Sequence, residues 1–184
     1  MKITKELLKE KGACVDGYRD FLREDPGDKY PDGVEYQELL DCCAEKNFSY
    51  GSWLLGAFGK TDEVRKIGGD LIAEKGIIFA GRLEVKGCIK AGWGIKAGNG
   101  IKAGRGIKAG WGIEAGWGIE AGNGIKAGYG IEAGYGIKAG DEYGIYAGLR
   151  CRITNKTLRK IIAKKRPENI MCGEFEEKSD SEGK

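Results

Sequence analysis

Histidine is absent from the 184 residues of this chain, and its absence restricts the chemistry that the sequence can support. Nucleophilic enzymes commonly activate a serine or cysteine with a neighbouring histidine, and histidine is the commonest side-chain ligand of protein-bound metals. Lysine or a carboxylate would have to take over both tasks. We therefore expect no enzymatic activity, no metal site and no cofactor.

The chain also lacks long apolar runs and paired cysteine motifs. No apolar stretch approaches the roughly 18 residues of a membrane-spanning helix, and Met1–Glu10 carries charge where a signal peptide has an apolar core. The six cysteines show no CxxC spacing, and the adjacent pair Cys42 and Cys43 is poorly placed for a disulfide. These features predict a cytoplasmic protein with reduced, mostly buried thiols and no membrane contact.

Glycine is abundant, with 33 residues, and it recurs in a fixed pattern. From Ile89 to Gly140 the sequence repeats every six residues, as in Ile-Lys-Ala-Gly-Trp-Gly. In an extended strand the isoleucine and alanine lie on one face and the lysine on the other. A helix is disfavoured, because each glycine costs about 1 kcal/mol relative to alanine. We expect the glycines to form corners through positive φ angles. Each unit is thus a short strand and a corner.

The residue between the two glycines indicates how many units close one turn of the chain. At a spacing of eighteen residues, this corner position gives two mainly aromatic columns and one polar column, whereas a spacing of twelve mixes them. The columns are Trp93, Trp111 and Tyr129; Asn99, Trp117 and Tyr135; and Arg105, Asn123 and Asp141. This sorting predicts a mainly β protein, a three-sided parallel β-solenoid with about 18 residues per coil.

The solenoid is expected to extend over residues 68–153. Apolar pairs keep the six-residue phase back to Leu71 and, after a two-residue slip at Asp141 and Glu142, forward to Cys151 and Ile153. Residues 1–60 are instead predicted to form a small helical head. Its four helices are expected to begin at Thr4, Asp16, Asp32 and Ser49, which are good helix-capping residues.

The helical head has two candidate roles. It can cover the first coil, whose apolar interior and strand edges need a lid. It can also bind a basic partner, because residues 1–63 contain fourteen Asp or Glu and nine Lys or Arg. Both roles remain open from the sequence.

After the solenoid, residues 154–166 are predicted to form a basic amphipathic helix with an apolar stripe of Leu158, Ile161 and Ile162. This helix would seal the last coil, or present a basic surface to nucleic acid or an acidic protein. Residues 167–184 are expected to be an acidic, flexible tail. The basic side chains of the predicted helix are Arg159, Lys160, Lys164, Lys165 and Arg166.

The solenoid surface carries the candidate binding site. With eighteen residues per coil, Lys90, Lys108 and Lys126 lie in one column, beside the corner column of Trp93, Trp111 and Tyr129. Trp117 and Tyr135 occupy the second aromatic corner. Aromatic and basic side chains together suit a macromolecular partner. Alternatively, the aromatic side chains stack on one another within the molecule or at a dimer contact.

Residues 68–92, which include Gly-Gly-Asp-Leu-Ile-Ala-Glu-Lys-Gly-Ile-Ile-Phe-Ala-Gly-Arg-Leu-Glu-Val, resemble bactofilins, the polymer-forming bacterial cytoskeletal proteins. The resemblance implies a three-sided β-helix that self-associates end to end, although bactofilins lack the helical segments expected here. Left-handed hexapeptide-repeat acyltransferases and carbonic anhydrases share only the six-residue period. In them the small residue precedes the aliphatic residue, and their activities need histidine, so the chain is not expected to share these activities.

The head, through Leu7–Cys14 and Trp53–Lys60, is similar to the openings of uncharacterised repeat proteins of phages and prophages. Phages use small non-enzymatic proteins to block host defence machinery, including CRISPR effectors. We therefore expect a non-enzymatic protein-binding module whose partner is a protein complex, such as a bacterial defence complex inhibited in the host cytoplasm. A self-associating scaffold of bactofilin type is the alternative, and nucleic-acid binding is the third hypothesis.

Overall fold

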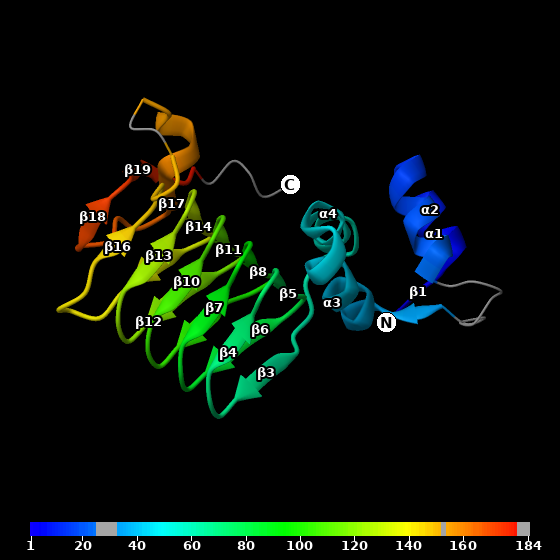
Figure 1. The fold of residues 1–184 in the computed structure, drawn as a ribbon, viewed down its shortest axis with the longest axis horizontal. Coiled ribbons are helices and arrows are strands. Elements are labelled where there is room, and N and C mark those ends of the chain that lie inside the picture. The colour runs from blue at the N-terminus through cyan, green and yellow to red at the C-terminus, as the bar shows by residue number, and fades with distance from the viewer. Residues whose placement is uncertain (25–32, 152–153, 180–184) are drawn as a thin grey trace.

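The computed structural model describes residues 1–24, 33–151 and 154–179. It shows a parallel β-solenoid with a group of helices at its N-terminal end (Figure 1). The solenoid has three sheets, and strands that pair with each other lie eighteen residues apart in the regular coils, as Ile107 does from Ile89 and Ile125. The predicted three-sided architecture is therefore confirmed.

Each regular coil supplies one strand to each sheet. Sheet 1 contains β3 (Val64–Ile67), β6 (Arg82–Val85), β9 (Ile101–Ala103), β12 (Gly118–Ala121) and β15 (Gly136–Lys138). Sheet 2 contains β4 (Leu71–Ala73), β7 (Ile89–Ala91), β10 (Ile107–Ala109), β13 (Ile125–Ala127), β16 (Ile145–Tyr146) and β18 (Ile170–Cys172). Sheet 3 contains β5 (Ile77–Phe79), β8 (Ile95–Ala97), β11 (Ile113–Ala115), β14 (Ile131–Ala133), β17 (Lys160–Ala163) and β19 (Glu174–Glu177).

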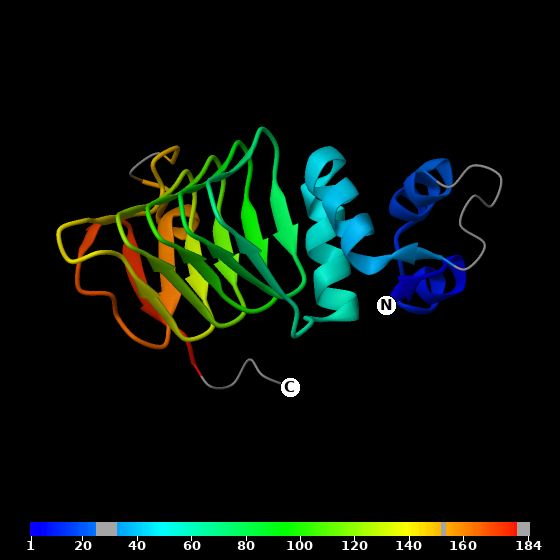
Figure 2. The same ribbon diagram turned by 90° about the horizontal axis from the view of Figure 1, so that it is seen from below.

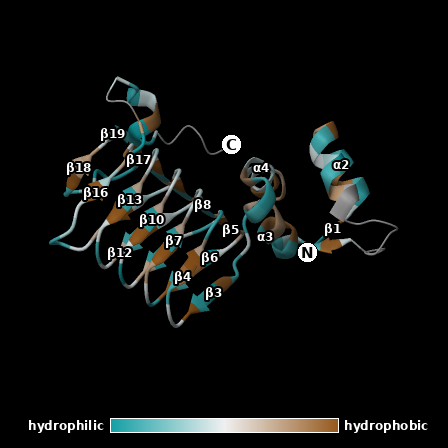
Figure 3. Cartoon of the chain, viewed as in Figure 1, coloured by the Kyte–Doolittle hydropathy of each residue, from teal (hydrophilic) through white to brown (hydrophobic). Residues whose placement is uncertain are grey.

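The isoleucine and alanine of each regular unit point inward and form one continuous buried core. The intervening lysine or glutamate points outward, so hydrophobic and hydrophilic residues alternate along the strands (Figure 3). None of the described helices is long and apolar enough to cross a membrane.

Glycine is required at the corners for a different reason from the predicted one. None of the repeat glycines from Gly92 to Gly140 has a positive φ angle. The first glycine of each corner instead lies against the backbone of the preceding coil: a Cβ atom on Gly116 would be 2.0 Å from the carbonyl oxygen of Gly98. The corner thus needs glycine because successive coils approach too closely for any side chain.

The boundaries of the solenoid differ from the predicted range of 68–153. It begins at Val64, because β3 pairs with β6 ahead of the first predicted unit. The unit expected at Cys151 and Ile153 is wrong, since Cys151 lies in a bend. Ile153 is outside the described residues.

The predicted C-terminal helix over residues 154–166 is also wrong. A single 3-10 turn, η1 (Lys156–Arg159), is followed by β17, in which Ile161 pairs with Ile131 of β14. Ile161 and Ala163 enter the core just as an Ile-x-Ala unit does. The free edge of β14 offers this segment a full set of backbone hydrogen bonds and a buried site. That combination outweighs a weak helical preference.

The flexible tail predicted for residues 167–184 is wrong for its first part, which continues the solenoid. Strand β18 pairs with β16, and β19 pairs with β17. Phe175 of β19 packs against the core, and the Arg166 guanidinium lies 5.3 Å from its ring centroid. Figure 2 shows these last strands at the end of the solenoid opposite the helices.

The head contains α1 (Lys5–Glu10), α2 (Val15–Glu24), α3 (Tyr36–Lys46) and α4 (Phe48–Phe58). Thr4 caps α1 as predicted, accepting the Leu7 N–H at 3.3 Å. Asn47, and not Ser49, caps α4, while α2 begins at Val15 with Asp16 in its first turn. Asp32, the cap expected for α3, lies outside the described residues, but the predicted start of this helix is wrong, because Val34–Glu35 form β2 and α3 begins at Tyr36. Between the helix pairs, β1 (Lys2–Ile3) runs antiparallel to β2 (Val34–Glu35).

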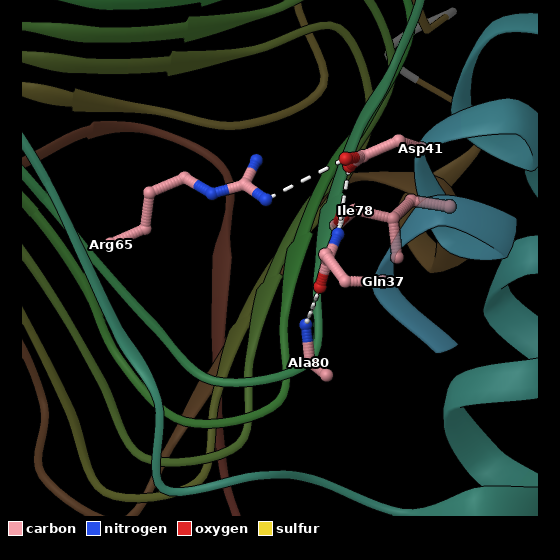
Figure 4. Close-up of polar contacts among 5 residues, drawn as sticks. All are labelled: Gln37, Asp41, Arg65, Ile78 and Ala80. Atoms are coloured by element: carbon pink, nitrogen blue, oxygen red, sulfur yellow. Dashed lines mark hydrogen bonds and ion pairs between the residues drawn. The ribbon is translucent and has the colours of Figure 1, made fainter. Parts of the chain in front are cut away.

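Helices α3 and α4 cover the outer edge of β5. The Gln37 carboxamide donates to the Ile78 carbonyl at 2.8 Å and accepts the Ala80 N–H at 3.0 Å, as a neighbouring strand would (Figure 4). Asp41 accepts a second Gln37 hydrogen bond at 2.7 Å and pairs with Arg65 at 3.5 Å. One glutamine side chain thus satisfies the backbone groups of this strand edge.

Candidate functional site

The outer face of sheet 2 presents Lys90, Lys108 and Lys126 on three adjacent strands, which we call the lysine row. Lys108 of β10 is in register with Lys90 of β7 and Lys126 of β13. All three side chains are exposed. Because neighbouring strands lie about 4.8 Å apart, the row places three positive charges on a narrow strip. The predicted lysine column is therefore present in the structure.

The other two sheets neutralise their outward charges. On sheet 3, Lys96 pairs with Glu114 at 2.6 Å and Lys178 with Glu132 at 2.8 Å. On sheet 1, Lys102 pairs with Glu120 at 3.1 Å. Within the described residues, no carboxylate lies at ion-pair distance from any member of the lysine row. Like charges on adjacent strands oppose folding. Sheet 3 also has Glu114 in register with Glu132, but each of these glutamates has a lysine partner, whereas the lysine row places three positive charges side by side.

Apolar and aromatic side chains lie at both ends of the lysine row. Ile72 of β4 is in register with Lys90, and its side chain is 64% exposed. Tyr146 of β16 is in register with Lys126, whose ammonium lies 5.2 Å from the tyrosine ring centroid. The strip thus combines positive charge at its centre with apolar surface at its ends.

The first aromatic column lies at the corner between sheets 2 and 3, next to the lysine row. Trp93 and Trp111 stack with their centroids 5.2 Å apart and an interplanar angle of 4°. Lys75 lies over Trp93 at 4.8 Å, and Phe48 of α4 meets Trp111 edge-on at 6.0 Å. Tyr129 is the more exposed member of the column. The two tryptophans therefore stack within the molecule, as the alternative interpretation expected.

The second aromatic column lies at a different corner, between sheets 3 and 1. Trp117 and Tyr135 stack at 5.1 Å, and the Lys165 ammonium lies 4.9 Å from the Tyr135 ring centroid. They border a hollow of about 820 Å³ on sheet 1, which is lined by charges of both signs, including Lys102, Glu120 and Lys138. The structure thus brings Trp93, Trp111 and Tyr129 to the lysine row and keeps Trp117 and Tyr135 away from it.

The five basic residues expected on one C-terminal helix do not share a face. Arg159 binds Glu174 at 3.0 Å, and Lys160 forms an ion pair with Glu176. Lys165 and Arg166 lie over Tyr135 and Phe175, and Lys164 is exposed. The predicted basic helical surface is therefore wrong, because the segment is a turn followed by a strand.

An ion pair at the polar corner was not foreseen from the sequence. Arg105 donates to Asp70 at 2.6 Å, and the same carboxylate oxygen accepts the Cys88 N–H at 2.8 Å. The Cys88 hydrogen bond, and then Arg105, lower the pKa of Asp70, while Asp70 raises the pKa of Arg105. This charge pair joins the corner after β3 to the corner after β9, beside the lysine row.

The described residues contain no group of three or more acidic or cysteine side chains arranged to hold a metal ion. The cysteines form no disulfide among the described residues. No protein-family model, curated protein or solved structure matches this chain.

Proposed function

We propose that this chain is a non-enzymatic binding protein whose lysine row binds an acidic surface of a partner protein. The observation that supports the proposal is the contrast among the three faces. On two faces, outward lysines form ion pairs with glutamates, and on the third, three lysines lie in register without an ion-pair partner among the described residues. Such a row is unfavourable in the free protein and becomes favourable when a partner supplies carboxylates.

The solenoid suits this role because its binding face is formed before the partner arrives. The strands of sheet 2 are held by ladders on both sides, from β7 through β13, over a buried core. Little backbone entropy is lost when such a face binds, so more of the interaction energy appears as affinity.

The aromatic corner favours a protein partner over single-stranded nucleic acid, because its tryptophan rings are already in contact with other side chains. Bases bind to such surfaces by stacking on open aromatic faces. Both faces of Trp93 are occupied, by Trp111 and by Lys75. Ile72 and Tyr146 instead offer apolar contacts at the ends of the lysine row, which suit a folded protein surface.

We further propose that the partner is a bacterial defence complex and that binding inhibits it. The support for this narrower role is the likeness of Leu7–Cys14 and Trp53–Lys60 to the openings of phage and prophage repeat proteins. An acidic surface on such a complex is the feature that the lysine row would recognise.

The test is affinity capture from nuclease-treated bacterial lysate with two matched variants. One changes Lys90, Lys108 and Lys126 to Gln, and the control changes Lys66, Lys102 and Lys138 of sheet 1 to Gln. Both remove three positive charges. We expect the wild type and the control to capture the same protein, and the lysine-row variant to lose it. Equal capture by both variants would refute the proposal, as would capture that depends on nucleic acid.

A further inference from the structure

The lysine row is the middle of a longer line of outward side chains on sheet 2. Five consecutive strands carry this line in register, with Ile72 of β4 first, then Lys90, Lys108 and Lys126, and Tyr146 of β16 last. Figure 1 shows these strands in order along the solenoid. Because neighbouring strands lie about 4.8 Å apart, the line is about 19 Å long and follows the solenoid axis.

Both ends of this line are apolar. Ile72 is exposed at one end. At the other end, Met171 of β18 is 66% exposed, and a Cβ atom on Gly144 would touch both Met171 and Tyr146. These two side chains therefore lie together over Gly144. A partner that contacts the whole line would bury apolar groups at both ends and meet three positive charges between them.

The charge of this face is positive along most of its length. A Cβ atom on Gly110 would lie 3.5 Å from Arg150 Nη1, so Arg150 adds a fourth cation at the corner between sheets 2 and 3. A hollow of about 360 Å³ lies beside the row and is lined by all three lysines and by one carboxylate, that of Glu142. Asp70, close to Lys90, is bound to Arg105. The face therefore complements a partner with several carboxylates.

The three strands of the lysine row offer a partner side chains only. Strands β7, β10 and β13 each pair with a neighbour on both sides, so their backbone groups are engaged within the sheet. An extended segment placed across this face would find no backbone partner there. An α-helix forms its backbone hydrogen bonds internally and can bind through side chains alone.

The spacing of the row also fits a helix better than an extended strand. The strands of Lys90 and Lys126 are about 9.6 Å apart. Helix side chains at i, i+3 and i+7 cover about 10.5 Å, whereas three alternate residues of an extended strand cover about 13 Å. A helix stripe at i, i+4, i+7, i+11 and i+14 is about 21 Å long, close to the length of the whole line.

Given an acidic protein partner, as in the proposed function on which this rests, we propose that the partner's binding element is an amphipathic helix laid along the solenoid axis. Its stripe carries three carboxylates, which face Lys90, Lys108 and Lys126. An apolar side chain at each end of the stripe contacts Ile72 or Tyr146. The helix diameter of about 10–12 Å matches a face whose strands are three residues, or about 10 Å, wide.

Fluorescence anisotropy with labelled synthetic peptides tests this element. The striped peptide has leucine at its first and fifteenth positions and glutamate at its fifth, eighth and twelfth, with alanine and glutamine elsewhere and a helix-locking cross-link on the opposite side. A second peptide of the same composition distributes the glutamates around the helix. We expect the second to bind about tenfold more weakly, because only one of its charges can face the row at a time.

Protein variants show where the striped peptide binds. Changing Lys90, Lys108 and Lys126 to Gln should abolish its binding, whereas the variant with Lys66, Lys102 and Lys138 changed to Gln should bind like the wild type. Ile72→Ser should weaken binding if the helix reaches the end of the line. The control is Val64→Ser, since Val64 is 43% exposed on sheet 1. It should leave the affinity unchanged.

A charge exchange tests the alignment of the helix with the row. Lys108→Glu should weaken binding of the striped peptide and strengthen binding of a peptide whose central glutamate is replaced by lysine. The axial helix is overturned if the two glutamate arrangements bind equally, if Ile72→Ser has no effect, or if the charge exchange does not restore binding. Any of these results leaves the acidic partner standing when lysate capture still depends on the lysine row. Capture that is equal in both lysine variants overturns the proposed function itself.

Discussion

Lys96 on β8 lies 2.6 Å from Glu114 on the neighbouring strand β11, whereas the equivalent positions on sheet 2 hold Lys90 and Lys108, in register. The two pairs occupy the same place in the repeat and differ in the sign of one residue. The same position of the repeat therefore holds an attractive lysine–glutamate pair on sheet 3 and a repulsive lysine–lysine pair on sheet 2.

This comparison predicts that Lys108→Glu stabilises the protein. The substitution replaces two like-charge contacts, to Lys90 and Lys126, by two opposite-charge contacts. We expect the free energy of unfolding in low salt to rise by about 1 kcal/mol. The reverse change, Lys96→Glu, places three glutamates in register on sheet 3 and should lower it by a similar amount. Urea denaturation measures both, and a stabilisation that persists unchanged at high salt would contradict the electrostatic explanation.

The corner glycines lead to a second prediction, tested on either side of Trp117. Gly116→Ala would place a Cβ atom 2.0 Å from the Gly98 carbonyl oxygen, so the coils must separate and the free energy of unfolding should fall by about 1–3 kcal/mol or more. Gly118→Ala meets the Gly136 carbonyl oxygen at 3.5 Å, an ordinary contact. Its effect should be small. Equal effects from the two substitutions in thermal or urea denaturation would show that close approach is not what selects glycine.

The regular part of the solenoid could be predicted from the sequence because its period determines both the strands and their register. Once Lys90 and Lys108 are eighteen residues apart in an eighteen-residue coil, their position on adjacent strands follows. The C-terminal part was predicted wrongly because Leu158, Ile161 and Ile162 also fit a helical stripe. The signal for a strand was the Ile-x-Ala pattern of Ile161 and Ala163, which returns after η1.

The contacts that join distant segments had no local signal in the sequence. Gln37 binds the backbone of Ile78, 41 residues further along the chain, and Asp70 binds Arg105, 35 residues away. From the sequence alone, any exposed polar residue of α3 could have been expected to bind the strand edge. Only the packing of α3 against β5 selects Gln37.

This cap gives a third prediction. Gln37→Ala removes one hydrogen bond to β5 and one to the residue that follows it, and leaves the Ile78 carbonyl and the Ala80 N–H without their partner. We expect the free energy of unfolding to fall by about 1–3 kcal/mol and the Ala80 amide to exchange faster with deuterium. Asp41→Ala, which removes only the outer hydrogen bond and the ion pair to Arg65, should have a smaller effect. Unchanged exchange at Ala80 in the Gln37 variant would argue against the cap.

Tyr36 provides a prediction for alkaline pH. Its single hydroxyl hydrogen is shared between the Gly59 carbonyl at 2.9 Å and the Leu54 carbonyl at 3.3 Å, and burial raises the pKa of Tyr36 to about 12. In the unfolded chain the same phenol titrates near its ordinary value of about 10. Between these two values the unfolded state has released the proton and the folded state still holds it. This group's contribution to stability is therefore complete below about pH 10 and declines as the pH rises towards 12.

Tyr36→Phe should remove this part of the pH dependence. The variant loses the one hydrogen that Tyr36 shares between two carbonyls, so at neutral pH its free energy of unfolding should lie about 1–2 kcal/mol below that of the wild type. The wild type loses its tyrosine-dependent stability above about pH 10, whereas phenylalanine has no proton to release. The difference between the two proteins should therefore shrink as the pH rises, which urea denaturation at a series of pH values would measure. A constant difference across this range would mean that Tyr36 ionises as easily in the folded protein as in the unfolded chain.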